Sequence, residues 1–313
     1  MTKETIDVIV IGAGLSGIGA AAHLQKRCPS LSYTVVEMRD ALGGTWDLFR
    51  YPGIRSDSDM YTLGYNFKPW THPDSIADGS TIRDYIRETA REYGIDRHIR
   101  YNHRVESLDW DSRKARWTLR ARKTGTGEVV AIESRFVICC AGYYRYDQGF
   151  TPEFPGRESF RGQVIHPQAW PENLEYSGKR VVVIGSGATA VTLVPSLAEK
   201  AGHVTMLQRS PSYVASMPKA GTIANRLRKY LPEKAVYALT RVAHIGLAMA
   251  FYSYTRARPE AARRFLLKQV QKQVGTDFDM KHFTPDITRG TNGFALCRTG
   301  ICSPSCGMVG PRL

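Results

Sequence analysis

The pattern of apolar and polar positions predicts alternating strands and helices in the first two thirds of the chain. Almost uninterrupted apolar runs occupy residues 6–11 and 180–184, and a third run that mixes apolar and polar residues occupies 203–208. Short runs rich in Val and Ile are typical of strands buried in a parallel sheet. The first two runs each lead into a glycine-containing turn and then a stretch typical of a helix. The pattern therefore predicts two βα units of the α/β class.

Both turns have the spacing G-x-G-x-x-G/A. The first contains Gly12, Gly14, Ser16 and Gly17, and the second consists of Gly185, Ser186, Gly187, Ala188, Thr189 and Ala190. In this spacing the first glycine makes the turn, the second lets a pyrophosphate approach the backbone, and the third small residue lets helix pack on strand. For either turn alone, a tight bend without a ligand is the alternative. Two copies behind predicted strands indicate two Rossmann-like dinucleotide-binding domains.

The residues that end the next strand separate the two sites. A ribose 2′ position is expected there, about 20 residues beyond the glycines. Glu37 offers a carboxylate that accepts hydrogen bonds from ribose hydroxyls and repels a 2′-phosphate, whereas Arg209 and Ser210 suit a 2′-phosphate. We expect FAD at the first site and NADPH at the second. The alternative for Glu37 and Arg209 is a solvated strand end.

A segment between the two sites resembles a known family. Its signature residues are Phe160, Gly162, His166, Trp170 and Pro171. They match the motif F-x-G-x-x-x-H-x-x-x-W-P of the Baeyer–Villiger flavin monooxygenases, and the chain looks most similar to the ethionamide-activating members. In that family the segment links the domains and couples cofactor movement to catalysis. On the residues alone, His166 reads equally well as a structural histidine between aromatic anchors, and we do not expect a general base.

Two further stretches look like the flavin-contacting loops of the family. The matching residues are Gly44, Thr45, Trp46 and Asp47 in the first stretch and Arg55, Ser56 and Asp57 in the second. A Gly-Gly turn brings backbone amides near a phosphate, and Trp46 offers a flat surface that excludes water. By resemblance, Asp57 lies beside the flavin ring and steadies a catalytic arginine. Its alternative is an ordinary turn aspartate.

The resemblance implies an FAD- and NADPH-dependent monooxygenase. In the family, NADPH reduces FAD, and a C4a-peroxyflavin then inserts one oxygen from O₂ into a ketone or a soft sulfur such as a thioamide. The catalytic arginine of the family lies in a Trp-Asp-Gln-Arg stretch that this sequence does not encode. Arg289 and Arg298 lie outside any such motif. A truncated remnant that at most binds FAD or NADPH is therefore an alternative function.

The last segment, 286–313, shows no core pattern. One choice of synonymous codons for residues 288–303, read in a shifted frame, gives Pro-Trp-Asp-Gln-Arg-Leu-Arg-Ala-Val-Pro-Asp-Gly-Asp-Leu-Phe-Ala, which resembles the next motif of the family. We infer a frameshift near residues 285–288, an early stop and an incomplete FAD domain. Sequencing the gene tests this hypothesis against the reading frame of an intact homologue.

Charge adds a third alternative. The net charge is +14, and much of the excess lies in residues 219–281, among apolar side chains. Solvated helix faces explain this pattern, and a peripheral membrane-binding module is the alternative. No base-reading motif supports nucleic-acid binding. No apolar stretch is expected to span a bilayer, because His244 interrupts the best one.

The six cysteines form no C-x-x-C pair, which argues against a disulfide reductase or a metal site. We expect Cys139 and Cys140 to be buried in a cytoplasmic protein. The predicted organisation is an FAD-binding domain at 1–145, a linker at 146–177, an NADPH-binding domain with a basic helical insertion at 178–285, and an out-of-frame tail at 286–313.

Overall fold

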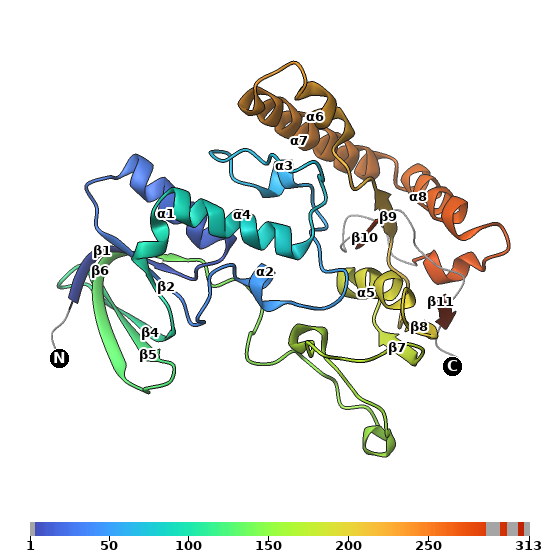
Figure 1. Cartoon of the computed structure of the whole chain (residues 1–313), viewed down its shortest axis with the longest axis horizontal. Helices are drawn as coiled ribbons and strands as arrows, with labels where there is room; N and C mark the ends of the chain where they lie inside the picture. Colours follow the sequence, from blue (N-terminus) through green and yellow to red (C-terminus); the bar gives the residue numbers. More distant parts are fainter. Residues whose placement is uncertain (1–3, 286–294, 299–305, 310–313) are drawn as a thin grey trace. The chain divides into compact units, whose positions relative to one another are not determined.

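The computed structural model of the chain describes residues 4–285, 295–298 and 306–309 (Figure 1). Tertiary contacts divide it into two compact units. Unit 1 comprises Met1–Phe49 and Gly79–Ala169, and unit 2 comprises Arg50–Asp78 and Trp170–Leu313. The predicted boundaries placed residues 50–78 with the first domain, whereas the contacts group them with the second. The later division, between Ala169 and Trp170, falls inside the signature segment.

Unit 1 is built on a six-stranded sheet in the order β3-β2-β1-β6-β5-β4. The strands are β1 (Glu4–Ile11), β2 (Tyr33–Val36), β3 (Ile99–Arg100), β4 (His103–Asp111), β5 (Arg116–Lys123) and β6 (Val129–Cys139). The first four strands of this order pair in parallel, and β6, β5 and β4 pair antiparallel. Strand β1 therefore lies between β2 and β6, where the connections diverge to opposite sides. Ligands of α/β sheets bind at the carboxyl end of such a strand.

The helices of unit 1 include the one expected after the first glycine turn. They are α1 (Leu15–Arg27), α2 (Thr45–Leu48), α4 (Gly79–Glu92) and the 3₁₀ turns Ile95–His98, Arg157–Ser159 and Pro167–Ala169. Helix α1 buries small residues, Gly17, Gly19, Ala21 and Ala22, around Ile18. Small side chains let the helix axis approach the sheet closely, and this approach fixes the helix start at the carboxyl end of β1.

Unit 2 has a three-stranded parallel sheet in the order β11-β8-β7 and a parallel pair of β9 and β10. The strands are β7 (Arg180–Ile184), β8 (His203–Leu207), β9 (Val214–Met217), β10 (Ala295–Arg298) and β11 (Cys306–Val309). The helices are α3 (Met60–Leu63), α5 (Ala188–Ala198), α6 (Thr222–Leu227), α7 (Glu233–Ala257), α8 (Pro259–Val274) and the 3₁₀ turn Met280–Phe283. Helices α6 to α8 form the predicted helical insertion.

Two expectations about burial are wrong. Strand β7 was expected to be buried, but Val182 and Ile184 are each 60% exposed. Cys139 is exposed and Cys140 half-buried. An apolar run predicts a strand without saying which of its faces another element covers. Helix α7 runs through His244, and among the described residues it is a candidate membrane span by length and composition alone.

The predicted out-of-frame tail lies mostly outside the described residues. Of it the structure describes only β10 and β11, which extend the strands of unit 2. The proposed frameshift point, near residues 285–288, and Arg289 also lie outside the described residues, apart from Pro285.

Candidate functional site

The first glycine turn closes tightly between β1 and α1. Gly12 has φ +100°, a conformation that favours glycine, and a Cβ there would meet the carbonyl oxygen of Cys140 at 2.5 Å. A Cβ on Gly17 would collide with the carbonyl oxygen of Gly12. The turn therefore requires glycine at both positions for internal packing. The exposed Ser16 and the first-turn amides of α1 stand at the helix N-terminus, where backbone N–H groups favour an anion.

Glu37 follows β2 and is 5% exposed. Its Oε2 accepts a hydrogen bond from the amide of Ala13 at 2.7 Å, and its Oε1 accepts one from the amide of Arg39 at 3.0 Å. A carboxylate has about four acceptor sites, so these two bonds leave capacity for hydroxyl donors. The acid predicted to meet a ribose thus lies beside the first glycine turn.

The first of the two flavin-loop stretches closes over the first glycine turn within unit 1. The amide of Gly43 donates to the carbonyl oxygen of Ala13 at 3.0 Å. A Cβ on Gly44 would lie 3.0 Å from the Cα of Gly14. The two backbones form a cradle that side chains would fill. Thr45 and the half-buried Trp46 start α2 beside it, and the Thr45 hydroxyl lies 3.3 Å from that of Tyr146.

Asp47 of α2 is 2% exposed and bound on both oxygens. Arg39 donates to Oδ2 and Arg87 of α4 donates to Oδ1, each at 2.8 Å. This pairing joins the loop after β2, α2 and α4. Sequence reasoning placed Asp47 at the cofactor but missed both arginines, since their spacing from the aspartate carries no pattern.

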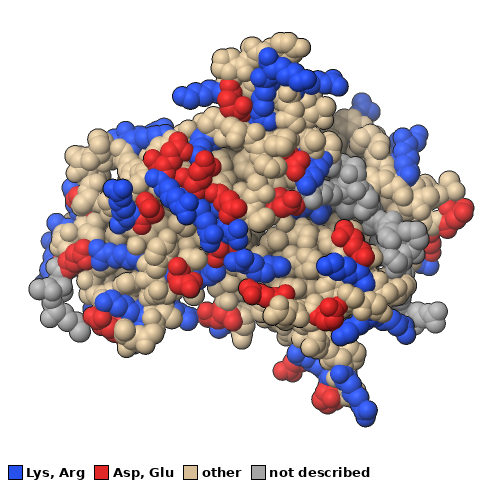
Figure 2. Space-filling model, viewed as in Figure 1, with Lys and Arg blue, Asp and Glu red and all other residues tan. Residues whose placement is uncertain are grey.

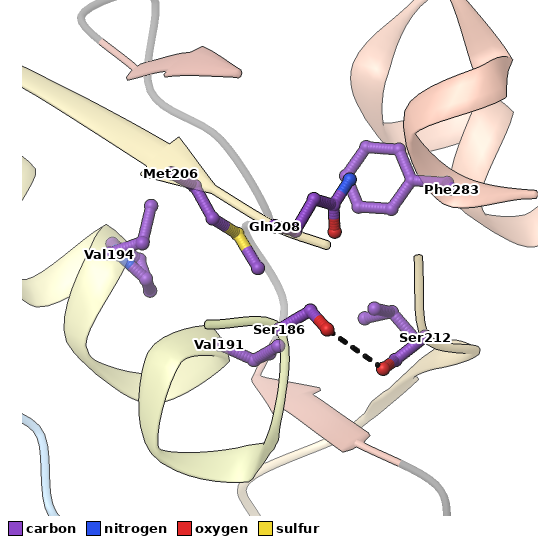
Figure 3. A pocket seen from close by; sticks show the side chains of 9 residues that line it. Ser186, Val191, Val194, Met206, Gln208, Ser212 and Phe283 are labelled. Atoms are coloured by element: carbon purple, nitrogen blue, oxygen red, sulfur yellow. Dashed lines mark hydrogen bonds between the residues drawn. The ribbon is translucent and has the colours of Figure 1, made fainter. Parts of the chain in front are cut away.

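The second glycine turn lies in unit 2, between β7 and α5. Gly185 donates its amide to the carbonyl oxygen of Leu207 at 2.8 Å, which ties the turn to the end of β8. Ser186 donates its hydroxyl to the carbonyl oxygen of Ser210 at 2.9 Å and lies 3.3 Å from the hydroxyl of Ser212 (Figure 3). Gly187 and Ala188 are exposed at the start of the helix, and a Cβ on Gly187 would meet nothing within 4 Å.

Arg209 and Ser210 stand where the sequence predicted, in the loop after β8 and next to this glycine turn. Both are exposed. Gln208, which was not predicted, is buried and donates its amide to the carbonyl oxygen of His282 at 2.7 Å. Gln208 and Phe283 line a small pocket with Ser186, Val191, Val194, Pro195, Met206, Ser212 and Val214 (Figure 3). Thr189 and Ala190 belong to the first turn of α5.

The predicted Asp57 segment also belongs to unit 2. Arg55 and Ser56 are buried at 8% and 2% exposure. The Ser56 amide donates to the carbonyl oxygen of Ala77, and the Ser58 amide donates back to the Ser56 hydroxyl at 3.0 Å. Asp57 Oδ1 is buried and has no hydrogen-bond partner among the described residues. Burial raises the pKa of this carboxyl, and the charge of Arg55 opposes the rise.

The signature residues divide between the units. Phe160 is 61% exposed, and a Cβ on Gly162 would touch its ring. His166 is half-buried, and its Nδ1 accepts a hydrogen bond from the amide of Gln168 at 3.2 Å. In unit 2, Trp170 packs edge-on against Tyr176, with 6.4 Å between ring centroids, and Pro171 is exposed. The His166 contacts agree with a structural histidine.

The chain is similar to known flavin-binding monooxygenases. The chain matches the model of the flavin-binding monooxygenase-like family over residues 5–224. It is 52% identical over 284 residues to the FAD-containing monooxygenase EthA of Mycobacterium tuberculosis, covering 90% of this chain and 58% of that protein. It is 50% identical over 284 residues to the probable FAD-binding monooxygenase AlmA of Acinetobacter baylyi, covering 90% and 57%. The chain thus spans less than two thirds of these relatives.

Solved structures share the fold. An oxidised steroid monooxygenase bound to NADP aligns with a TM-score of 0.79 at 25% identity, covering 98% of this chain and 65% of that one. The OTEMO complex with FAD and NADP aligns with a TM-score of 0.77 at 22% identity, covering 97% and 65%, and shows the fold alone. The α/β prediction with two Rossmann-like units is confirmed. The resemblance inferred from the sequence is confirmed as well: the chain belongs to the flavin-binding monooxygenase-like family.

Proposed function

We propose that the chain binds FAD in unit 1 and NADPH in unit 2 and serves a monooxygenase reaction that inserts one oxygen from O₂ into a ketone or a soft sulfur such as a thioamide. One observation carries the proposal: the two glycine turns each open a helix at the carboxyl end of a parallel strand, one beside Glu37 and the other beside Arg209. Family membership supports the same reaction class.

The residues of unit 1 fit FAD. The glycine backbones of Gly14 and Gly44 leave a cradle for a pyrophosphate, and the N-terminus of α1 favours its charge. Glu37 would accept hydrogen bonds from the ribose. Gly12 and Gly17 shape the turn, and Thr45 and Trp46 would flank the flavin. When bound, FAD supplies electron acceptance from NADPH and the activation of O₂.

The residues of unit 2 fit NADPH. Gly187, Ala188 and the first turn of α5 present backbone to solvent where a pyrophosphate would bind. Arg209 would pair with the 2′-phosphate, and Ser210 would donate to it. Gly185, Ser186, Thr189 and Ala190 would hold the turn in shape.

Asp57 would serve the reaction from the same unit. Its unpartnered Oδ1 is a buried acceptor, and such a group is costly unless a donor reaches it. A bound cofactor amide or a guanidinium would supply that donor. Arg55 and Ser56 would fix the orientation of Asp57, and the signature residues Phe160, Gly162, His166, Trp170 and Pro171 would act as the link between the predicted domains.

The visible absorbance of the purified 313-residue chain tests the proposal. We expect bound yellow flavin that bleaches when NADPH is added without oxygen, and oxidation of ketones or thioamides when air is admitted. A colourless protein that does not take up added FAD would contradict the first site. Flavin that binds but does not bleach would contradict the second site.

Replacing Arg209 should weaken the binding of NADPH but not that of NADH. The variant Arg209→Gln loses a charge-assisted hydrogen bond to the 2′-phosphate, so we expect NADPH to bind roughly 10- to 100-fold more weakly and NADH to bind unchanged. Titration of each nucleotide measures this. Arg180→Gln is the control. Arg180 is the first residue of β7, at the end of the strand away from the glycine turn, so its replacement should leave the affinities for both nucleotides unchanged. An equal loss for both nucleotides would contradict the assignment.

Two alternatives have observations of their own. The missing Trp-Asp-Gln-Arg stretch favours a remnant that at most binds FAD or NADPH, and flavin that bleaches without any substrate oxidation would support it. Helix α7 favours a peripheral membrane module, because Val242, Leu247 and Met249 are 66–70% exposed. Figure 2 shows Lys and Arg side chains around this helical part. Sedimentation with anionic liposomes at low and high salt tests it. The expected cytoplasmic location stays a prediction.

A further inference from the structure

The segment Arg50–Asp78 belongs to unit 2, although unit 1 precedes and follows it in the sequence. It approaches α5 of the second glycine turn at two points. Tyr51, whose pKa burial raises, shares a side-chain hydrogen bond with Thr189. A Cβ on Gly53 would collide with Ser196 of α5. The start of the segment therefore lies against the helix that would bind NADPH.

Helix α7 holds the middle of the segment by its polar side chains. Arg241 donates from one nitrogen to the carbonyl oxygens of Tyr61 at 2.7 Å and Gly64 at 2.9 Å. Tyr237 donates its hydroxyl to the carbonyl oxygen of Tyr65 at 2.9 Å. The carbonyls of Tyr61 and Gly64 lie at the end of the short helix α3, where the last C=O groups lack intrahelical donors, and Tyr65 follows directly.

An ion pair completes the attachment. His244 Nδ1 lies 3.0 Å from Asp59 Oδ1, and the Tyr61 ring meets the imidazole edge-on. Asp59 also caps α3 by accepting from the amide and hydroxyl of Thr62. Two residues before Asp59 stands Asp57, and the Met60 amide donates to the carbonyl oxygen of Ser75 at 2.7 Å. The turn carrying Asp57 is thereby fixed from both sides.

We propose that Tyr237, Arg241 and His244 of α7 are positioning residues that hold the Asp57 segment as one body with the NADPH-binding β7–α5 turn. The role of these residues in catalysis rests on the proposed function, in which Asp57 faces the cofactors. The attachment itself does not depend on it. These α7 residues give the basic helical insertion a task that its charge pattern did not predict.

The attachment depends on pH through His244. The hydrogen bond to Asp59 raises the pKa of His244 above 6.5, burial opposes this, and the charge of Asp59 adds to it. The pKa of Asp59 is lowered. Burial would raise it, but the hydrogen bond and charge of His244 and the hydrogen bonds from Thr62 outweigh burial.

Several other ionisable groups lie around this pair. They are Tyr61, Tyr237, Arg241 and the pair Arg228–Glu233. Burial raises the pKa of Tyr61 and of Tyr237, so both phenols stay neutral. The His244–Asp59 contact is therefore fully formed between about pH 3.9 and 6.5, the unfolded Asp and His values. It weakens as pH rises through the raised His244 pKa and as pH falls through the lowered Asp59 pKa.

Hydrogen exchange of the 313-residue chain, followed by mass spectrometry, tests the proposal. In Arg241→Gln we expect the amides of Thr62, Leu63 and Gly64 to exchange roughly tenfold or more faster at pH 6. In His244→Gln we expect the same amides to exchange faster than in the wild type at pH 6. Between pH 6 and pH 9, the wild-type amides should gain exchange beyond the change in intrinsic rate, and those of His244→Gln should not. The controls Arg256→Gln on the exposed face of α7 and His203→Gln on β8 should match the wild type.

Addition of NADP⁺ tests the connection to the site. In the wild type we expect slower exchange both at residues 185–190 and at residues 57–66, and in Arg241→Gln slower exchange at 185–190 alone. Equal exchange of 57–66 in the wild type and both variants without ligand would overturn the attachment. Equal protection of 57–66 by NADP⁺ in all chains would overturn its positioning role. If NADP⁺ protects neither segment of the wild type, the proposed nucleotide site fails, and the ligand-free comparison still decides the attachment.

Discussion

The substitution Gly17→Ala is expected to destabilise unit 1 and to abolish flavin binding. Its Cβ would collide with the carbonyl oxygen of Gly12, and backbone on both sides cannot rotate away as a side chain could. Helix α1 would have to move from β1, at a cost of about 3 kcal/mol. Urea unfolding measures the loss of stability, and the flavin absorbance of the purified variant measures the loss of the site.

Gly14→Ala is the matched control, because it adds the same methyl group three residues earlier. Its Cβ would lie 3.6 Å from the Cα of Gly44, which is ordinary contact, and the φ of Gly14 is −81°. Stability should change by less than about 0.5 kcal/mol. Flavin binding should still fall, since the methyl group would occupy the cradle. A Gly17→Ala variant that unfolds like the wild type and stays yellow would contradict the packing argument.

Asp47→Asn is expected to lower the stability of unit 1 by about 2–4 kcal/mol. The carboxylate is buried between Arg39 and Arg87, and the amide would turn an NH₂ donor toward one of these donors. Two guanidinium groups would lose their counter-charge. The value lies below that of a fully buried pair, because the arginine side chains are 20% and 36% exposed. Thermal and urea unfolding measure it.

Asp84→Asn provides the control for this change. Asp84 lies on α4, near Arg87 in sequence, and pairs with Arg83 at 3.0 Å, but its side chain is 62% exposed. Exposed pairs contribute about 0–1 kcal/mol, so this variant should unfold close to the wild type. If both aspartates cost the same, the buried double pairing does not stabilise the unit. If Asp47→Asn keeps its stability but loses flavin, Asp47 is a cofactor ligand rather than a structural one.

The glycine turns and strand ends could be predicted because their requirements are local. The chain must turn within a few residues between a buried strand and a helix, and glycine is needed there for steric reasons that the sequence displays. Glu37 and Arg209 could be predicted by the same argument, because the next parallel strand ends about 20 residues beyond the glycines. Both lie in the structure beside the turn they were assigned to.

The contacts that bind distant segments could not be predicted. The local sequence around Asp59 is typical of a turn, and His244 interrupts an apolar run. Neither pattern predicts that the two residues contact each other. The sequence around Asp47 likewise does not predict its ion pairs with Arg39 and Arg87. The apolar runs around Val182 and Cys139 indicate strands correctly, but burial depends on which element covers each face, and that is decided by tertiary packing.

The placement of residues 50–78 also has a consequence for synthesis. Arg241 lies 180 residues after the carbonyl it binds on Tyr61. At 5–20 residues per second, a ribosome needs about 9–36 s to make that stretch. During this time the nascent segment has no α7 to dock on, while β1, α1 and β2 are already complete. A chaperone that shields exposed apolar surface would therefore be expected to engage the emerging chain between these two points, and to release it once α7 has left the exit tunnel.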